Sequence, residues 1–223
     1  MVKIVSLILF LVLVASSAAL GADQPFSFAL KGGIGLANMT TTYEEKPDPV
    51  NIMRPSGGFN LSSGVASHVG IDLDCLYVTK GSDEKIVTQG MPPDEINMKT
   101  QIHYVVLSPM LRLTPGTGSG GVYLLGGAEV GYMIDAKTDV RIVSASGEAY
   151  KDQYDMSSRL KDLDYGATVG LGFQTGSRDG SGLFLEGRYA LGMTDIKNTQ
   201  VSTVERIPDV KTRTVYLFGG VRF

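Results

Sequence analysis

The stretch Lys211–Phe223, which reads KTRTVYLFGGVRF, decides how we interpret the fold. Side chains of a β-strand point alternately to its two faces, so every second residue of this stretch shares a face. From Val215 onward one face holds only apolar residues and glycine, and it ends in the aromatic Phe223. Termini of soluble domains usually lie at the surface and fray, so an apolar strand at the very end is unusual for them. It is typical of the strand that closes a membrane barrel, whose apolar face meets lipid. The alternative is the last strand of a soluble antiparallel sheet.

The composition agrees with a barrel and excludes several other classes. The chain has 223 residues, a net charge of -3, 28 glycines and 19% charged residues. No polybasic surface indicates nucleic-acid binding, so we expect no nucleic-acid partner. The single cysteine, Cys75, excludes an internal disulfide framework and a cysteine-based zinc site. After the N-terminus no apolar run is long enough for a spanning helix, whereas barrel strands are apolar only at alternate positions.

The N-terminus reads as a secretory signal peptide covering residues 1–21. Lys3 gives the positive start, residues 4–14 form the apolar core, and Ala19 and Gly21 are the small residues that a signal peptidase reads. Cleavage would leave a mature barrel domain of residues 22–223. The alternative is an uncleaved anchor helix.

Alternation predicts eight strands in the mature chain. We place them at residues 26–37, 57–66, 69–80, 98–113, 121–135, 163–175, 182–194 and 211–223. Long polar loops (39–55, 81–97, 136–162 and 195–210) alternate with short connections, which is the asymmetry of outer-membrane barrels. We therefore expect an all-β fold, an eight-stranded antiparallel up-and-down transmembrane β-barrel. Pro109 donates no ladder hydrogen bond, so we expect a local break or bulge there.

The face opposite the apolar one carries charged residues of both signs. The predicted lumen charges are Lys31, Asp72, Asp74, Arg112, Glu129, Asp164, Glu186, Arg188 and Arg222. An eight-stranded barrel is just wide enough for side chains to fill, and buried charges are tolerated when they are paired. We interpret these residues as a structural network that closes the lumen. The alternatives are a narrow ion path and a catalytic cluster.

No catalytic, cofactor or metal site stands out. The chain has two histidines, His68 and His103, and nothing fixes a nucleophile beside either of them. The acidic pairs at 44–45, 83–84 and 94–95 could bind a divalent cation, but solvated loops are the commoner meaning of such pairs. We expect no enzyme, no cofactor and no metal. A lipid-modifying enzyme would need His103 as its base, so unchanged lipid profiles in a His103→Ala variant would count against that alternative.

Several segments resemble the PorT-like small outer-membrane β-barrel proteins. The segments are LKGGIGLANM (30–39), FNLSSGV (59–65), DLDCLYVTKG (72–81), IHYVVLSPMLRL (102–113), LLGGAEVGYM (124–133), LDYGATVGLGF (163–173), LFLEGRYALGMTDI (183–196) and LFGGVRF (217–223). Together they span most of the mature chain. The sequence departs from the family pattern at Leu107, where an acidic residue is usual, and at Asp74, where glutamate is common.

The resemblance implies a location in the cell outer membrane and insertion by the barrel-assembly machinery. That machinery would read the C-terminal strand, here through Tyr216, Leu217, Val221 and Phe223. The expected partners are outer-membrane lipid, the assembly machinery and a possible protein bound by the external loops. We expect a structural or loop-mediated interaction role. The alternatives are a narrow porin-like channel, an accessory component of protein secretion and, less favoured, a soluble ligand-binding calyx with reversed faces.

Overall fold

The fold consists almost entirely of β-strands in a computed structural model. The structure describes residues 26–41, 52–87, 95–116, 120–144, 149–176, 181–196 and 210–223. Its elements are β1 (Phe26–Thr41), β2 (Ile52–Ala66), β3 (Val69–Val87), β4 (Glu95–Leu113), β5 (Gly120–Val143), β6 (Ala149–Asp155), the 3-10 turn η1 (Ser157–Arg159), β7 (Leu163–Thr175), β8 (Gly182–Gly192) and β9 (Val210–Arg222). The predicted signal peptide lies outside the described residues. Among the residues that are described, no helix is long and apolar enough to cross a membrane.

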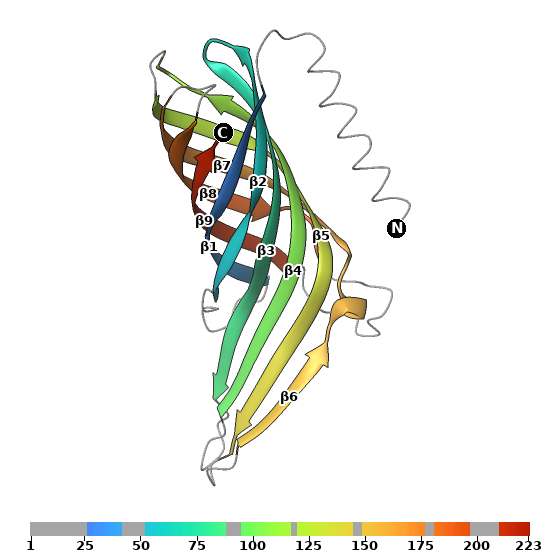
Figure 1. The fold of residues 1–223 in the computed structure, drawn as a ribbon. Coiled ribbons are helices and arrows are strands. Elements are labelled where there is room, and N and C mark those ends of the chain that lie inside the picture. Colours follow the sequence, from blue (N-terminus) through green and yellow to red (C-terminus); the bar gives the residue numbers. More distant parts are fainter. Residues whose placement is uncertain are drawn as a thin grey trace.

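Eight of these strands close into a barrel. The hydrogen-bonded order is β4-β3-β2-β1-β9-β8-β7-β5, and a β4–β5 ladder joins the two ends of that order. Every ladder of the ring is antiparallel. The first and last strands meet at the β1–β9 seam, where Phe28 and Phe223 exchange two backbone hydrogen bonds. The predicted eight-stranded antiparallel barrel is therefore confirmed (Figure 1).

The two faces of the ring differ in the way that the alternation predicts. Apolar side chains point outward from every strand of the ring and stay exposed, as Leu30 on β1, Leu171 on β7 and Leu217 on β9 illustrate. Polar and charged side chains alternate with them and are buried inside. This is the polarity of a lipid-facing barrel. A soluble calyx would need the reverse arrangement.

Aromatic side chains mark both margins of the outer face. The exposed residues Phe26, Phe173 and Phe223 lie at the end of the ring where the strands are joined by short connections, which we call the turn end. Exposed tyrosines (Tyr77, Tyr165 and Tyr189) lie toward the opposite end, which we call the loop end. Two aromatic girdles of this kind flank the apolar band of membrane barrels.

At the loop end, three neighbouring strands continue past the ring. The ladder between β2 and β3 ends at Gly57 and Tyr77, whereas β3 pairs with β4 up to the Val87–Glu95 pair. β5 continues to Val143 and forms a hairpin with β6, which pairs with β5 alone. We call this extension of β3, β4, β5 and β6 the projecting sheet, and Figure 1 shows it reaching away from the ring toward the bottom of the view.

The prediction of loops at 81–97 and 136–162 was wrong for much of both segments, because strands of the projecting sheet occupy them. Residues 136–142 alternate charged with uncharged residues as a strand does, whereas residues 81–87 and 149–155 show no regular alternation. The polar and charged composition of both segments indicates loops. Smaller corrections apply elsewhere: β1 runs on to Thr41, β2 begins at Ile52, and β8 ends at Gly192 rather than at residue 194. His103 accordingly lies in the interior of β4 and not near its start.

The expected irregularity at Pro109 takes the form of a gap without a bulge. The β4–β5 ladder passes from the Leu107–Val130 pair to the Met110–Gly127 pair with no change of register. Between these pairs, Ser108 and Pro109 have no partner on β5. The register shift of this ladder lies elsewhere, between His103 and Tyr104. Pro109 has no N–H to donate, which explains the missing pairs but requires no extra residue.

Candidate functional site

Ten charged side chains are buried among the described residues, five of each sign. They include all nine predicted lumen charges, and the tenth is Lys80. The alternation of side chains along a strand could have predicted Lys80 as well. It is an even number of residues from Asp72 and Asp74 on β3, so it points to the same side of the sheet. The ten charges group into three clusters along the barrel.

The central cluster is a closed ring of four charges. Asp74 Oδ2 accepts hydrogen bonds from Lys31 Nζ at 3.0 Å and from Arg188 Nη1 at 2.5 Å. Glu186 Oε2 accepts from the same two cations, at 3.0 Å from Lys31 Nζ and 2.5 Å from Arg188 Nη2. Each cation therefore bridges both carboxylates, and the cluster has no net charge. The four residues come from β1, β3 and β8, so the cluster ties three strands of the wall together.

Neighbouring polar and aromatic groups complete this cluster. Tyr123 donates its hydroxyl to Glu186 Oε1 at 2.7 Å, and Asn60 Nδ2 donates to Asp74 Oδ1 at 2.7 Å. Lys31 Nζ also lies 5.3 Å from the centre of the Phe184 ring, within the range of a cation–π interaction. All four carboxylate oxygens thus accept a hydrogen bond, which is the condition under which buried charges are tolerated.

A second cluster lies nearer the turn end. Arg112 donates from Nε and Nη2 to Asp72 Oδ2, at 3.1 and 2.5 Å. Gln174 Oε1 accepts from Arg112 Nη1 at 3.1 Å and from Arg222 Nη1 at 2.7 Å, so one amide links two arginines. The Arg112 guanidinium stacks 4.5 Å from the centre of the Tyr123 ring, which connects this cluster to the central one.

The third cluster lies nearer the loop end. Lys80 Nζ donates to Glu129 Oε1 at 2.8 Å and to Asp164 Oδ2 at 3.1 Å. Thr212 donates its hydroxyl to the same oxygen of Asp164 at 3.0 Å. Beside this cluster the interior becomes apolar. Buried Ile102, Tyr104, Ala136, Ile196 and Tyr216 belong to one packed group, against which Met156 and Leu160 also pack.

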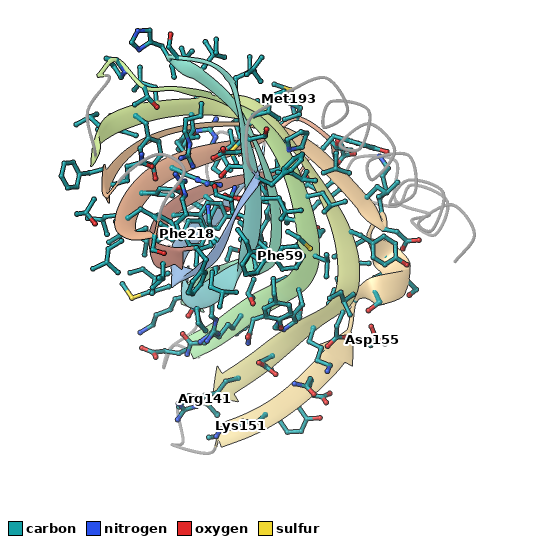
Figure 2. All side chains as sticks on the ribbon, turned by 45° about the horizontal axis from the view of Figure 1, so that its top comes forward. Phe59, Arg141, Lys151, Asp155, Met193 and Phe218 are labelled. Carbon is teal, nitrogen blue, oxygen red and sulfur yellow. The ribbon has the colours of Figure 1, made fainter. Side chains whose placement is uncertain are left out.

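The projecting sheet has two unlike faces. On its inner face, which continues the lumen side of the ring, the ladders place four half-buried apolar residues together: Ile96, Met98, Val140 and Ile142. Tyr150 and Tyr154 lie on the same face of β6. The outer face carries charges of both signs, such as Lys85, Asp139 and Arg141. Figure 2 shows Arg141, Lys151 and Asp155 out on β5 and β6, away from Phe218 in the barrel.

The remaining candidates lie on outer surfaces, with the exception of Tyr216. His103 Nδ1 is 2.7 Å from the Tyr77 hydroxyl and 3.1 Å from that of Thr79. Cys75 is a free, half-exposed thiol.

Of the predicted assembly signal, Leu217, Val221 and Phe223 point outward, whereas Tyr216 is buried in the lumen. Of the acidic residues considered for a cation, Glu95 is paired with Lys85 at 2.9 Å. No group of three potential metal ligands occurs among the described residues, and the absence of an enzymatic role stays a prediction.

A closed antiparallel ring with an apolar outer band, aromatic margins and a charged interior defines a transmembrane β-barrel. A family model described as "Outer membrane protein beta-barrel domain" matches residues 16–198. The chain belongs to this family, which places it in the bacterial outer membrane.

Solved structures with a similar ring include three surface or outer-membrane proteins. Ail, the attachment invasion locus protein of Yersinia pestis, is 14% identical, covering 88% of this chain and 98% of its own, with a TM-score of 0.37. Neisserial surface protein A is 11% identical over 88% and 95%, with a TM-score of 0.40. OprG from Pseudomonas aeruginosa is 13% identical over 90% and 97%, also at 0.40. No curated protein matches the sequence.

Proposed function

We propose that this protein is a non-conducting outer-membrane barrel that acts through its projecting sheet, by binding another macromolecule outside the cell. The observation that carries the proposal is the contrast between the two parts. The described lumen is occupied by paired charges, while one side of the wall extends beyond the ring as a sheet with an apolar inner face.

The lumen clusters support a closed interior. Eight strands enclose a space that side chains can fill. Here contacts span the ring: Asp74 of β3 meets Arg188 of β8, which is the opposite strand, and Lys80 of β3 meets Asp164 of β7, three strands away. A water path along the axis would have to separate these pairs. Separating a buried ion pair is costly, because each charge then lacks a partner in a medium of low dielectric constant.

The projecting sheet supports a binding role. Its strands continue well past the tyrosine girdle, so they reach beyond the apolar band. In a sheet that is surrounded by water on both sides, apolar side chains are not needed to form a core. The inner face of the projecting sheet nevertheless carries a contiguous set of them. Contiguous apolar surface that stays partly exposed commonly marks a place where another molecule binds.

Three finer points belong to the same proposal. The chain belongs to the PorT-like subgroup, its signal peptide is cleaved after Gly21, and the loop end faces outward. A partner protein bound outside the cell is compatible with an accessory role in secretion, but no described residue is specific to secretion.

Liposome swelling tests the closed lumen. Liposomes that contain the refolded protein should swell in isotonic small sugars no faster than protein-free liposomes, because the paired clusters leave no continuous water path. A large general porin serves as the positive control. Swelling at a rate that rises with the amount of folded protein would overturn the closed-lumen proposal and favour the narrow channel.

Cysteine labelling tests the orientation. In a Cys75→Ser background, Lys151→Cys on β6 should react with a membrane-impermeant maleimide in intact cells. Gly116→Cys, at the turn end, should react only after the outer membrane is permeabilised. Gly116 suits this control because it is exposed and a Cβ built there meets no atom within 4 Å. Labelling of residue 116 alone in intact cells would reverse the orientation and contradict the proposed function.

A further inference from the structure

The inner face of β6 carries a compact group of three residues, Tyr150, Asp152 and Tyr154, which we call the tyrosine clasp. Alternate residues of a strand share a face, so the carboxylate lies between the two rings. The β5–β6 register pairs these residues with Ile142, Val140 and Thr138, none of which is charged. Tyr150 is 60% exposed and Tyr154 is 50% exposed, so both rings are available to a ligand.

Hydrogen bonds hold the carboxylate of Asp152 in place. Its Oδ2 accepts from the Tyr150 hydroxyl at 3.4 Å, and its Oδ1 accepts from the Gln153 backbone N–H at 2.8 Å. Hydrogen bonding from Tyr154 and from the Gln153 N–H lowers the pKa of Asp152 below its ordinary value. The clasp therefore carries a full negative charge at neutral pH.

The charge of the clasp has no cationic counterpart in the described part of the chain. No described lysine or arginine forms an ion pair with Asp152, whereas Lys85, Lys137 and four of the five lumen cations have acidic partners. The nearby cations Lys137, Arg141 and Lys151 belong to the opposite face of the sheet, because they alternate with the residues of the clasp.

We propose that the tyrosine clasp binds a basic side chain, lysine or arginine, of a polypeptide partner. This inference rests on the proposed function of the projecting sheet and names the chemistry of its partner. A cation bound at the Asp152 carboxylate would lie beside the two exposed tyrosine rings, and the negative face of an aromatic ring attracts a cation within about 6 Å. The aliphatic stem of the same side chain would lie along the half-buried apolar residues of β4 and β5, Met98, Val140 and Ile142.

Each part of the clasp should contribute a measurable share of the affinity. A cation over an exposed aromatic ring is worth about two- to fivefold in affinity, and an exposed ion pair contributes a similar factor. Leucine in place of either tyrosine keeps apolar surface but removes the aromatic face. Asparagine in place of Asp152 keeps the acceptor for the Gln153 N–H but removes the charge.

The test uses the full-length protein, refolded in a polyoxyethylene detergent that has neither a choline nor a sugar head group. A fluorescently labelled hexalysine peptide is titrated with protein and followed by anisotropy, and hexaglutamate is the negative peptide control. Wild type should bind hexalysine saturably. Tyr150→Leu, Tyr154→Leu and Asp152→Asn should each raise the Kd about two- to fivefold. Heat-modifiable gel mobility verifies that each variant is folded.

Asp139→Asn is the matched charge control, because Asp139 lies on β5 of the same sheet but on the opposite face. It should change the Kd by less than the clasp variants do. Equal weakening by Asp139→Asn and Asp152→Asn would mean that only net charge matters, and this would overturn the inference. The absence of saturable hexalysine binding, or clasp-dependent binding of an uncharged oligosaccharide in its place, would overturn it as well.

A shortened sheet separates this inference from the proposed function. Asp83 lies opposite Lys99 in the β3–β4 ladder, and Asp139 lies opposite Gln153 in the β5–β6 ladder. Residues 84–98 and 140–152 can therefore each be replaced by an Asn-Gly turn that keeps the register. Loss of hexalysine binding in this variant, with the three clasp variants unaffected, would reject the clasp and keep the projecting sheet as the binding part. Full binding by the shortened protein would reject both.

Discussion

Arg188→Met should lower the free energy of unfolding by about 3–5 kcal/mol, the cost of breaking a buried ion pair by removing one partner. Arg188 is one of two cations that bridge Asp74 and Glu186. Without it, two buried carboxylates share the single charge of Lys31, and one negative charge is left uncompensated. The measurement is urea unfolding in detergent micelles or lipid vesicles, followed by the fraction of heat-modifiable protein.

The control removes one charge of each sign. In the Glu186→Gln, Arg188→Met double variant, Lys31 and Asp74 remain as a neutral pair at 3.0 Å. This variant should be more stable than Arg188→Met by at least about 1 kcal/mol, although it has lost more hydrogen bonds. A single variant that loses less than about 1 kcal/mol would mean that water solvates these charges. The lumen would then be wet, and the channel alternative would gain support.

Gly33→Ala should strongly reduce the yield of folded barrel. Gly33 lies on β1 at the seam and pairs with Phe218 of β9. A Cβ built on Gly33 would lie 1.9 Å from the backbone carbonyl oxygen of Leu217. Backbone atoms cannot move aside as the end of a side chain can, so the two strands would have to separate. We expect a cost at or above the upper end of the range of about 1–3 kcal/mol for overpacking.

The neighbouring glycine provides a matched control. Gly32 lies on the same strand and the same seam, but a Cβ there meets no atom within 4 Å. Gly32→Ala should therefore fold as wild type does, measured as the heat-modifiable fraction after refolding into vesicles. Equal yields of the two variants would show that the seam is looser than its geometry indicates.

The membrane-crossing part of the fold could be predicted from sequence because lipid imposes a strict pattern there. The segment 163–175 illustrates this: its outward residues include Tyr165, Val169, Leu171 and Phe173, and the predicted strand coincides with β7. Outside the apolar band, the expectation of an apolar residue at every second outward position no longer holds. On β5 beyond Ile134, the outer face carries Lys137 and Arg141, because it meets water and no longer lipid. The period of two persists there, but its polarity no longer distinguishes a strand from a loop.

The lumen could be predicted as a set of residues but not as a set of pairs. Parity alone puts Lys31 and Glu186 on the inner face of their strands. Their contact joins residues 155 positions apart and depends on the closure of the ring, which no local pattern encodes. The tyrosine clasp escaped prediction for a related reason. β6 lies within the predicted loop 136–162, and a loop prediction places neither Tyr150 nor Tyr154 on a face of a sheet.

The β1–β9 seam has a consequence for the kinetics of folding. Residues that pair across it are far apart in sequence, as Gly33 and Phe218 are. Contacts of such high sequence separation form late, because the entropy of closing the loop must be overcome before the contact is made. Until then the nascent sheet has two unpaired edges, and unpaired edges readily join other chains. Closure of the seam is therefore the step at which aggregation competes with folding, and a helper that shields both edges would act there.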